Sequence, residues 1–104
     1  MSTVADVVVA VALARAVGRV YGTEAAVEML RVVADIAEER GRQDEKWGDQ
    51  SGHPYLLWNA ILGEEVGEVS RVLLEDLDAK RLRAELVQIA AVAVAWVETI
   101  DKRG

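Results

Sequence analysis

Apolar residues recur along the chain at the spacing of α-helices rather than of strands. In the first segment, valines occur without strict alternation and are interspersed with alanines, a pattern that favours a helix over about residues 3–21. Gly22 then has the character of a helix C-cap, and Thr23 that of an N-cap. We therefore expect a second helix from Glu24 to about Arg40, on which apolar residues again recur every three or four positions.

The second half of the chain predicts two more helices and one long loop. Residues 42–54 are polar and contain the only proline and the only histidine, which indicates a loop, and a loop of this length is commonly functional. A third helix is expected from near Pro54 to about Leu74, and a fourth from Asp78, as N-cap, to about Ile100. The fold class predicted is all-α, a four-helix bundle type, with residues 1–104 forming a single domain.

The last two predicted helices each carry an apolar stripe that we expect to face the core. On the third helix the stripe comprises Trp58, Ile61, Leu62, Val66, Val69, Val72 and Leu73. On the fourth it comprises Leu82, Leu86, Ile89, Ala93, Trp96, Val97 and Ile100.

Composition supports helices and indicates self-association. The chain has 17 Val, 16 Ala, no Phe and one Pro, which argues against a β-sandwich or barrel. Small side chains in a 104-residue fold fill the core thinly, so we expect a dimer or a larger homo-oligomer.

Charge and residue types exclude several classes of function. The net charge of −6 argues against general binding to duplex nucleic acid or to anionic membranes. Without cysteine there is no disulfide or thiolate nucleophile, and one histidine excludes a multi-histidine metal site within one chain. Residues 1–20 lack the basic start of a signal peptide, and the uncharged, mostly apolar run 86–97 is too short to span a bilayer. A cytoplasmic protein is expected.

Acidic residues lie on or beside the apolar stripes of the last two helices. Glu65 and Glu68 are one helical turn apart on the flank of the third helix. Glu85 lies within the stripe of the fourth helix, and Gln88 follows one turn later. If the two helices pack antiparallel, these four side chains can meet.

A carboxylate on an apolar stripe is unfavourable unless something compensates its charge. One compensation is an ion pair with a nearby arginine, such as Arg71 or Arg83. The other is a hard cation, because clustered glutamate oxygens suit Mg²⁺ or Mn²⁺. Spacing alone leaves both readings open.

Three ordered motifs resemble those of the MazG-like family of all-α nucleoside triphosphate pyrophosphohydrolases. The segment 64–68, Glu-Glu-Val-Gly-Glu, followed by 85–88, Glu-Leu-Val-Gln, is similar to the EExxE…ExxD signature of that family. The stretch 39–48 resembles the segment before this signature in small MazG-like proteins, and 85–96 resembles their last helix. The resemblance covers about residues 36–100, and residues 1–35 form extra helices outside it.

The resemblance implies Mg²⁺-dependent cleavage of a nucleoside triphosphate between its α- and β-phosphates, giving a monophosphate and pyrophosphate. By position, Glu65, Glu68 and Glu85 match metal ligands, and Glu64 matches the candidate base for the attacking water. Phosphoryl transfer depends mainly on charge neutralisation and positioning, which carboxylate-held metals supply. Gln88 departs from the family pattern, because it stands where the motif has Asp. It can ligate Mg²⁺ through its amide oxygen but brings no negative charge, so we expect a second cation to bind more weakly than at a four-acid site.

Other residues are candidates for substrate binding, each with a simpler alternative. Trp47 is placed to stack on a nucleobase or to cover the core. Lys46 and Arg83 are placed to meet phosphates or to remain solvated, and Asn59 precedes the acids by about one turn. Two other functions stay open: a non-catalytic helical module that binds a nucleotide or a protein, and a hydrolase acting on a phosphoribosyl-ATP-like substrate.

Overall fold

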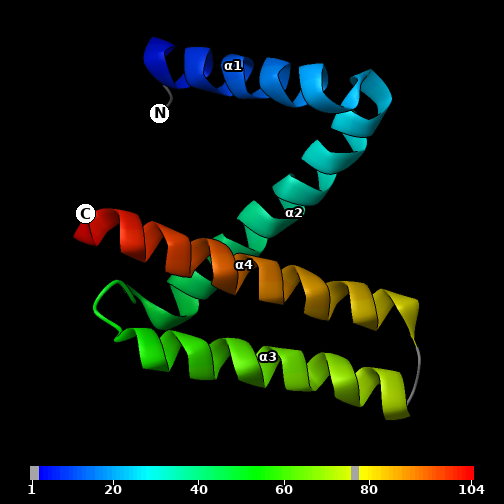
Figure 1. The fold of residues 1–104 in the computed structure, drawn as a ribbon, viewed down its shortest axis with the longest axis vertical. Coiled ribbons are helices and arrows are strands. Elements are labelled where there is room, and N and C mark those ends of the chain that lie inside the picture. Colours follow the sequence, from blue (N-terminus) through cyan, green and yellow to red (C-terminus); the bar gives the residue numbers. More distant parts are fainter. Residues whose placement is uncertain (1–2, 76–77) are drawn as a thin grey trace. The chain divides into compact units, whose positions relative to one another are not determined.

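The computed structural model describes residues 3–75 and 78–104, and all regular secondary structure in these residues is α-helical. This confirms the predicted all-α class. The helices shown in Figure 1 are α1 (Val4–Tyr21), α2 (Thr23–Trp47), α3 (Tyr55–Glu75) and α4 (Ala79–Arg103).

The first helix has well-defined caps at both ends. Thr3 and Asp6 form a reciprocal capping box, in which the Asp6 amide donates to the Thr3 hydroxyl at 3.1 Å and the Thr3 amide donates to the Asp6 carboxylate at 2.9 Å. Gly22 ends α1 with a φ of 78°, a conformation that favours glycine. The prediction for Gly22 is confirmed, whereas Thr23 is the first residue of α2 rather than a cap before it.

Helix α2 extends seven residues beyond its predicted end at Arg40, because it continues to Trp47. The prediction treated residues 42–47 as loop because they are polar. However, these residues make helical ion pairs: Glu39 binds Arg42 at 2.9 Å, and Arg40 binds Asp44 at 2.8 Å. The helix then stops at Gly48, whose amide donates to the Asp44 carbonyl and whose φ is 72°.

The chain divides into two compact units, residues 1–34 and residues 35–104. In the first unit α1 contains no buried residue, and Ala26 of α2 is buried. The second unit contains the end of α2, the loop at 48–54, and the helices α3 and α4. It begins one residue before the stretch 36–100 that carries the motifs.

Helices α3 and α4 pack side by side and antiparallel (Figure 1). The Asp78 carboxylate accepts a hydrogen bond from the Lys80 amide and caps the start of α4, as predicted. The packed centre consists of Trp58 from α3 with Val92 and Ala95 from α4. Trp58, only 2% exposed, is one of the two largest fully buried side chains described, which confirms its assignment to the core.

The buried face of α4 coincides only in part with the predicted one, since Leu82, Ile89, Ala93 and Trp96 of the predicted stripe are half-buried. The residues of α4 that are buried are Val87, Ala91, Val92, Ala95 and Thr99. By contrast, Leu86, Val97 and Ile100, which belong to the predicted stripe, are exposed. On α3 the prediction holds for Trp58 and Val72 but not for Val66 or Leu73. Helix α4 is apolar on two opposite faces, and small side chains face α3 because they allow close approach of the two backbones.

The last residues of α4 hold the loop that follows α2. The guanidinium of Arg103 donates to the backbone carbonyl of Ser51, at 2.8 Å, and to that of His53, and lies 4.8 Å from the ring centre of Tyr55. The His53 ring in turn contacts the Trp58 indole, with 5.4 Å between centroids. The loop is thus fixed at both α3 and α4 and can contribute to a site. No helix in the described ranges has an uncharged apolar stretch long enough to cross a membrane.

Candidate functional site

Glu65 is the centre of a group of carboxylates contributed by three helices. Its pKa is raised, first by burial and then by the negative charges of Glu85, Glu68, Glu64 and Glu39. These residues belong to α4, α3 and α2. Glu68 of α3 and Glu85 of α4 are therefore near enough to Glu65 to raise its pKa, and Glu39 of α2 adds to them.

One oxygen of Glu65 is unsatisfied. Its Oε2 atom is buried and has no hydrogen-bond partner. A buried acceptor without a partner costs free energy, and more so when it carries charge among other negative charges. A positively charged ligand at Glu65 would relieve this cost.

The glutamates offer the type of oxygen ligand that a hard cation prefers, but their carboxylates are too far apart to bind one ion together. Carboxylate oxygens are the ligands that Mg²⁺ prefers. Yet within residues 3–75 and 78–104 no three acidic or histidine side chains are gathered closely enough to hold one ion. A shared ion would therefore require these glutamate side chains to move together.

The two arginines considered as partners of the acids behave differently. Arg71 Nη1 lies 3.1 Å from Glu68 Oε1, so this carboxylate has a cationic neighbour one turn away on α3. Arg83 instead binds Asp35 of α2, with 2.7 Å between the nitrogen and the carboxylate oxygen. Because both pairs are largely exposed, water weakens them and they can open at little cost.

A cavity of about 280 Å³ adjoins the acidic group. Much of its wall consists of the Trp47 indole and of apolar side chains from α3 and α4. The carboxylates of the lining belong to Glu64 and Glu65. The complete lining is Gln43, Trp47, Gln50, Trp58, Ile61, Glu64, Glu65 and Val92. A mostly apolar wall beside carboxylates suits an aromatic ring whose charged group is positive, or is an anion neutralised by a cation.

The remaining predicted site residues are distributed over other surfaces. Lys46 lies 4.8 Å from the ring centre of Trp47, so the two neighbours form a cation–π contact. Asn59 is exposed on α3 and lines none of the three cavities described here. Gln88 and Arg83 line a separate cavity of about 410 Å³, together with Glu39 and Arg42. The structure therefore does not place Gln88 on the same cavity as Glu64 and Glu65.

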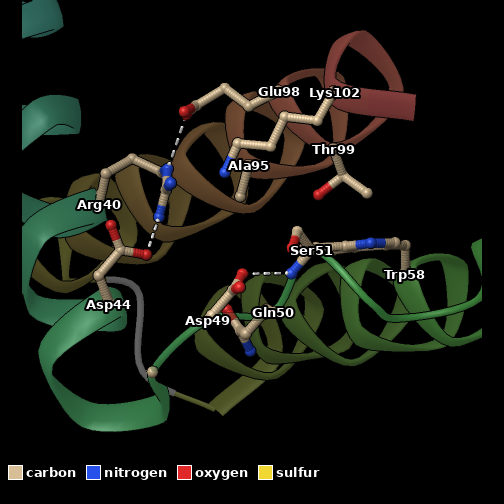
Figure 2. A pocket seen from close by; sticks show the side chains of 11 residues that line it. Arg40, Asp44, Asp49, Gln50, Ser51, Trp58, Ala95, Glu98, Thr99 and Lys102 are labelled. Atoms are coloured by element: carbon tan, nitrogen blue, oxygen red, sulfur yellow. Dashed lines mark hydrogen bonds and ion pairs between the residues drawn. The ribbon is translucent and has the colours of Figure 1, made fainter. Parts of the chain in front are cut away.

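A third, polar cavity of about 380 Å³ lies between the loop and the C-terminal part of α4 (Figure 2). Arg40 reaches across one side of it and binds both Asp44 of α2 and Glu98 of α4, at 2.8 and 3.1 Å. Trp58 lines this cavity as well as the apolar one. Arg40 thus joins α2 to α4 and helps to hold the end of α2 beside the site.

The sequence prediction missed Glu39, Gln43 and Gln50 as site residues. Glu39, Gln43 and Trp47 are four residues apart on α2 and share one face of the helix. This spacing is visible in the sequence, but it indicates a shared face only once residues 42–47 are known to be helical.

Comparisons of the chain with protein-family models, curated proteins and solved structures gave no match.

Proposed function

We propose that this protein is a nucleotide pyrophosphohydrolase that cleaves a nucleoside triphosphate between the α- and β-phosphates. The observation that carries the proposal is the position of Glu65. It is half-buried, with one unsatisfied oxygen, among four other glutamates and at one end of an indole-lined cavity. The resemblance of residues 36–100 to MazG-like proteins names the same acids. Such an enzyme would act in the cytoplasm.

Each acid has a proposed task. Glu65, Glu68 and Glu85 would hold Mg²⁺, or Mn²⁺, with Gln88 as a neutral oxygen donor. When bound, the metal supplies charge neutralisation for the phosphates. Glu64 is exposed on α3 beside Glu65, where its carboxylate can accept a proton from a water molecule.

The substrate would lie with its base in the cavity and its phosphates at the acids. Trp47 provides an exposed aromatic face for the base, and Lys46 beside it provides a positive charge. Arg83, close to Gln88, is the second cation that phosphates would meet once its pair with Asp35 opens.

We also propose that the active form is a homo-oligomer. The outer face of α4 exposes Leu86, Val94, Val97 and Ile100, which lie on the side of the helix opposite Ala91, Val92 and Ala95. Packing this face against a second copy would assemble two α3–α4 hairpins into a four-helix bundle of the predicted type.

The experiment is an assay of pyrophosphate release from a panel of ribo- and deoxyribonucleoside triphosphates, with and without Mg²⁺ or Mn²⁺. We expect metal-dependent release from at least one substrate, and loss of release in Glu65→Gln. If no substrate releases pyrophosphate and calorimetry detects no binding of either metal, the proposal is wrong.

The second candidate is a non-catalytic module that binds a nucleotide without turnover. Two observations favour it. Glu68 is paired with Arg71, and the fourth acid of the motif is replaced by Gln88. The change Gln88→Asp separates the two candidates, because activity that appears only in this variant would identify the native protein as a binder.

A further inference from the structure

Glu39 favours one orientation of the Gln43 amide, which lines the indole-lined cavity. Its Nε2 atom donates to Glu39 Oε2 at 3.4 Å. An ionised carboxylate has no proton to donate, so the amide must turn its NH₂ group toward Glu39. The oxygen at the other end of the same planar group remains as the acceptor that Gln43 can offer to the cavity.

Glu39 is itself held in place. Its carboxylate is only 15% exposed and also accepts a hydrogen bond from Arg42 Nε at 2.9 Å. The chain of contacts from Arg42 through Glu39 to Gln43 lies on α2, so it is a local property of this helix. A flip of the Gln43 amide would place its oxygen against the carboxylate, which is electrostatically unfavourable.

Gln43 lies one helical turn before Trp47, and both line the same cavity. A planar ring stacked on the indole would meet a group one turn away along the same wall with its edge rather than with its face. An amide oxygen attracts an amino group on that edge and repels a carbonyl group.

Resting on the proposed function, we infer that Gln43 selects nucleotides whose base carries an exocyclic amino group, such as adenine or cytosine. Their keto counterparts, hypoxanthine and uracil, are disfavoured. Glu39 is the positioning residue for this selection, because it prevents the amide flip that would accommodate a keto group.

The test compares bases that differ in this one group, using ligands that bind without turnover. Calorimetry in the absence of metal measures the affinities of adenosine against inosine, and of cytidine against uridine, because ligands without a phosphate are not repelled by the glutamates. A single hydrogen bond exchanged for a repulsive contact changes affinity by about tenfold. We expect the amino member of at least one pair to bind about tenfold more tightly to the native protein.

Four variants locate the origin of this ratio. Gln43→Leu removes the acceptor, and Glu39→Gln releases the amide to flip, so in both the amino-to-keto ratio should fall to within about threefold of unity. Glu38→Gln is the matched control, because it removes the same charge from an exposed neighbour on α2 but leaves the contact of Glu39 with Gln43, and the ratio should persist. Gln43→Glu keeps an oxygen acceptor and should also keep the ratio, even if both affinities decrease.

A ratio near one in the native protein overturns the inference, as does a ratio that survives both Gln43→Leu and Glu39→Gln. Equal weakening of both members of a pair in these variants would show a purely structural role and also overturn it. Failure of the proposed hydrolysis is a separate result, since it appears as absence of pyrophosphate release while the binding ratio is intact.

Discussion

Arg71 Nη1 lies 3.1 Å from Oε1 of Glu68, so one of the carboxylates predicted to bind metal already has a cationic neighbour. The other central acid, Glu65, is in the opposite situation, because its buried Oε2 has no partner and its surroundings are negative. The two acids are one turn apart on α3, and they differ because Glu68 is close to an arginine and Glu65 faces α4 and α2.

Replacement of Arg71 by Gln should strengthen metal binding. It removes the cation that competes for Glu68, and an exposed ion pair of this kind contributes up to about 1 kcal/mol, equivalent to roughly fivefold in affinity. Isothermal titration with Mn²⁺ measures the change. Arg81→Gln is the control for net charge, since Arg81 is also exposed, and it should leave the affinity nearly unchanged. Equal affinities for the native protein and Arg71→Gln would contradict a role for Glu68 in metal binding.

Glu65→Gln should stabilise the metal-free protein at pH 7. Burial and the neighbouring glutamates raise the Glu65 pKa above its ordinary value of 4.5, so the folded state holds the proton more tightly than the unfolded state. Its contribution to stability is therefore fully present below pH 4.5 and is lost as the pH rises through the raised pKa. The variant should gain on the order of 1 kcal/mol at pH 7 and little at pH 4.

Urea denaturation at the two pH values measures this difference. Adding Mg²⁺ provides the control, because it should stabilise the native protein but not Glu65→Gln. A variant that is less stable than the native protein at pH 7 would show that the charge of Glu65 is already compensated.

Truncation of Trp58 should lower the stability of the protein, whereas truncation of Trp47 should lower its affinity for nucleotide. Trp58 is almost completely buried, and Trp58→Ala should cost about 3–5 kcal/mol of stability. Trp47 is 62% exposed, so Trp47→Ala should change stability by less than about 0.5 kcal/mol while weakening nucleotide binding. Chemical denaturation and nucleotide titration of both variants check this. Unchanged nucleotide affinity in Trp47→Ala would contradict the proposed stacking of the base on Trp47.

Arg40→Ala should destabilise the protein by roughly 1–3 kcal/mol, because two partly buried, charged hydrogen bonds from one guanidinium are lost. The control is Arg42→Ala, whose guanidinium is 62% exposed and pairs only within α2, so its loss should cost less than about 1 kcal/mol. Thermal unfolding measured by circular dichroism compares the two. Similar losses of stability in both variants would show that the ion pair between Arg40 and Glu98 does not stabilise the protein more than a pair within α2 does.

Val97→Lys should dissociate a homo-oligomer. Val97 lies on the outer face of α4 and is 56% exposed, so a lysine fits there in a monomer but would be buried in the proposed interface. Sedimentation velocity measures the mass of both forms, with Lys80→Ala on an exposed part of α4 as the control. A native protein that sediments as a monomer would remove the proposed assembly.

Local sequence features determined much of the secondary structure. The caps at Thr3, Gly22 and Asp78 are short-range hydrogen bonds or backbone conformations, so they could be recognised from residue type and position alone. The end of α2 was missed because polar composition was taken as evidence for a loop. The local pairs of Glu39 with Arg42 and of Arg40 with Asp44 are also visible in the sequence, and they favour a helix.

The sequence by itself determined that the chain is helical. It also determined that Glu65 and Glu68 lie one turn apart on one helix and that Glu85 lies on the next helix. Only the tertiary structure decided which face of α4 is buried, because both faces are apolar and the choice depends on how closely two backbones can approach. The same packing placed Gln43 on the cavity that Glu64 and Glu65 line, and left Gln88 at another cavity, which Glu39 also lines. Helical periodicity fixes neighbours within a helix, whereas contacts between helices depend on the shapes of both partners.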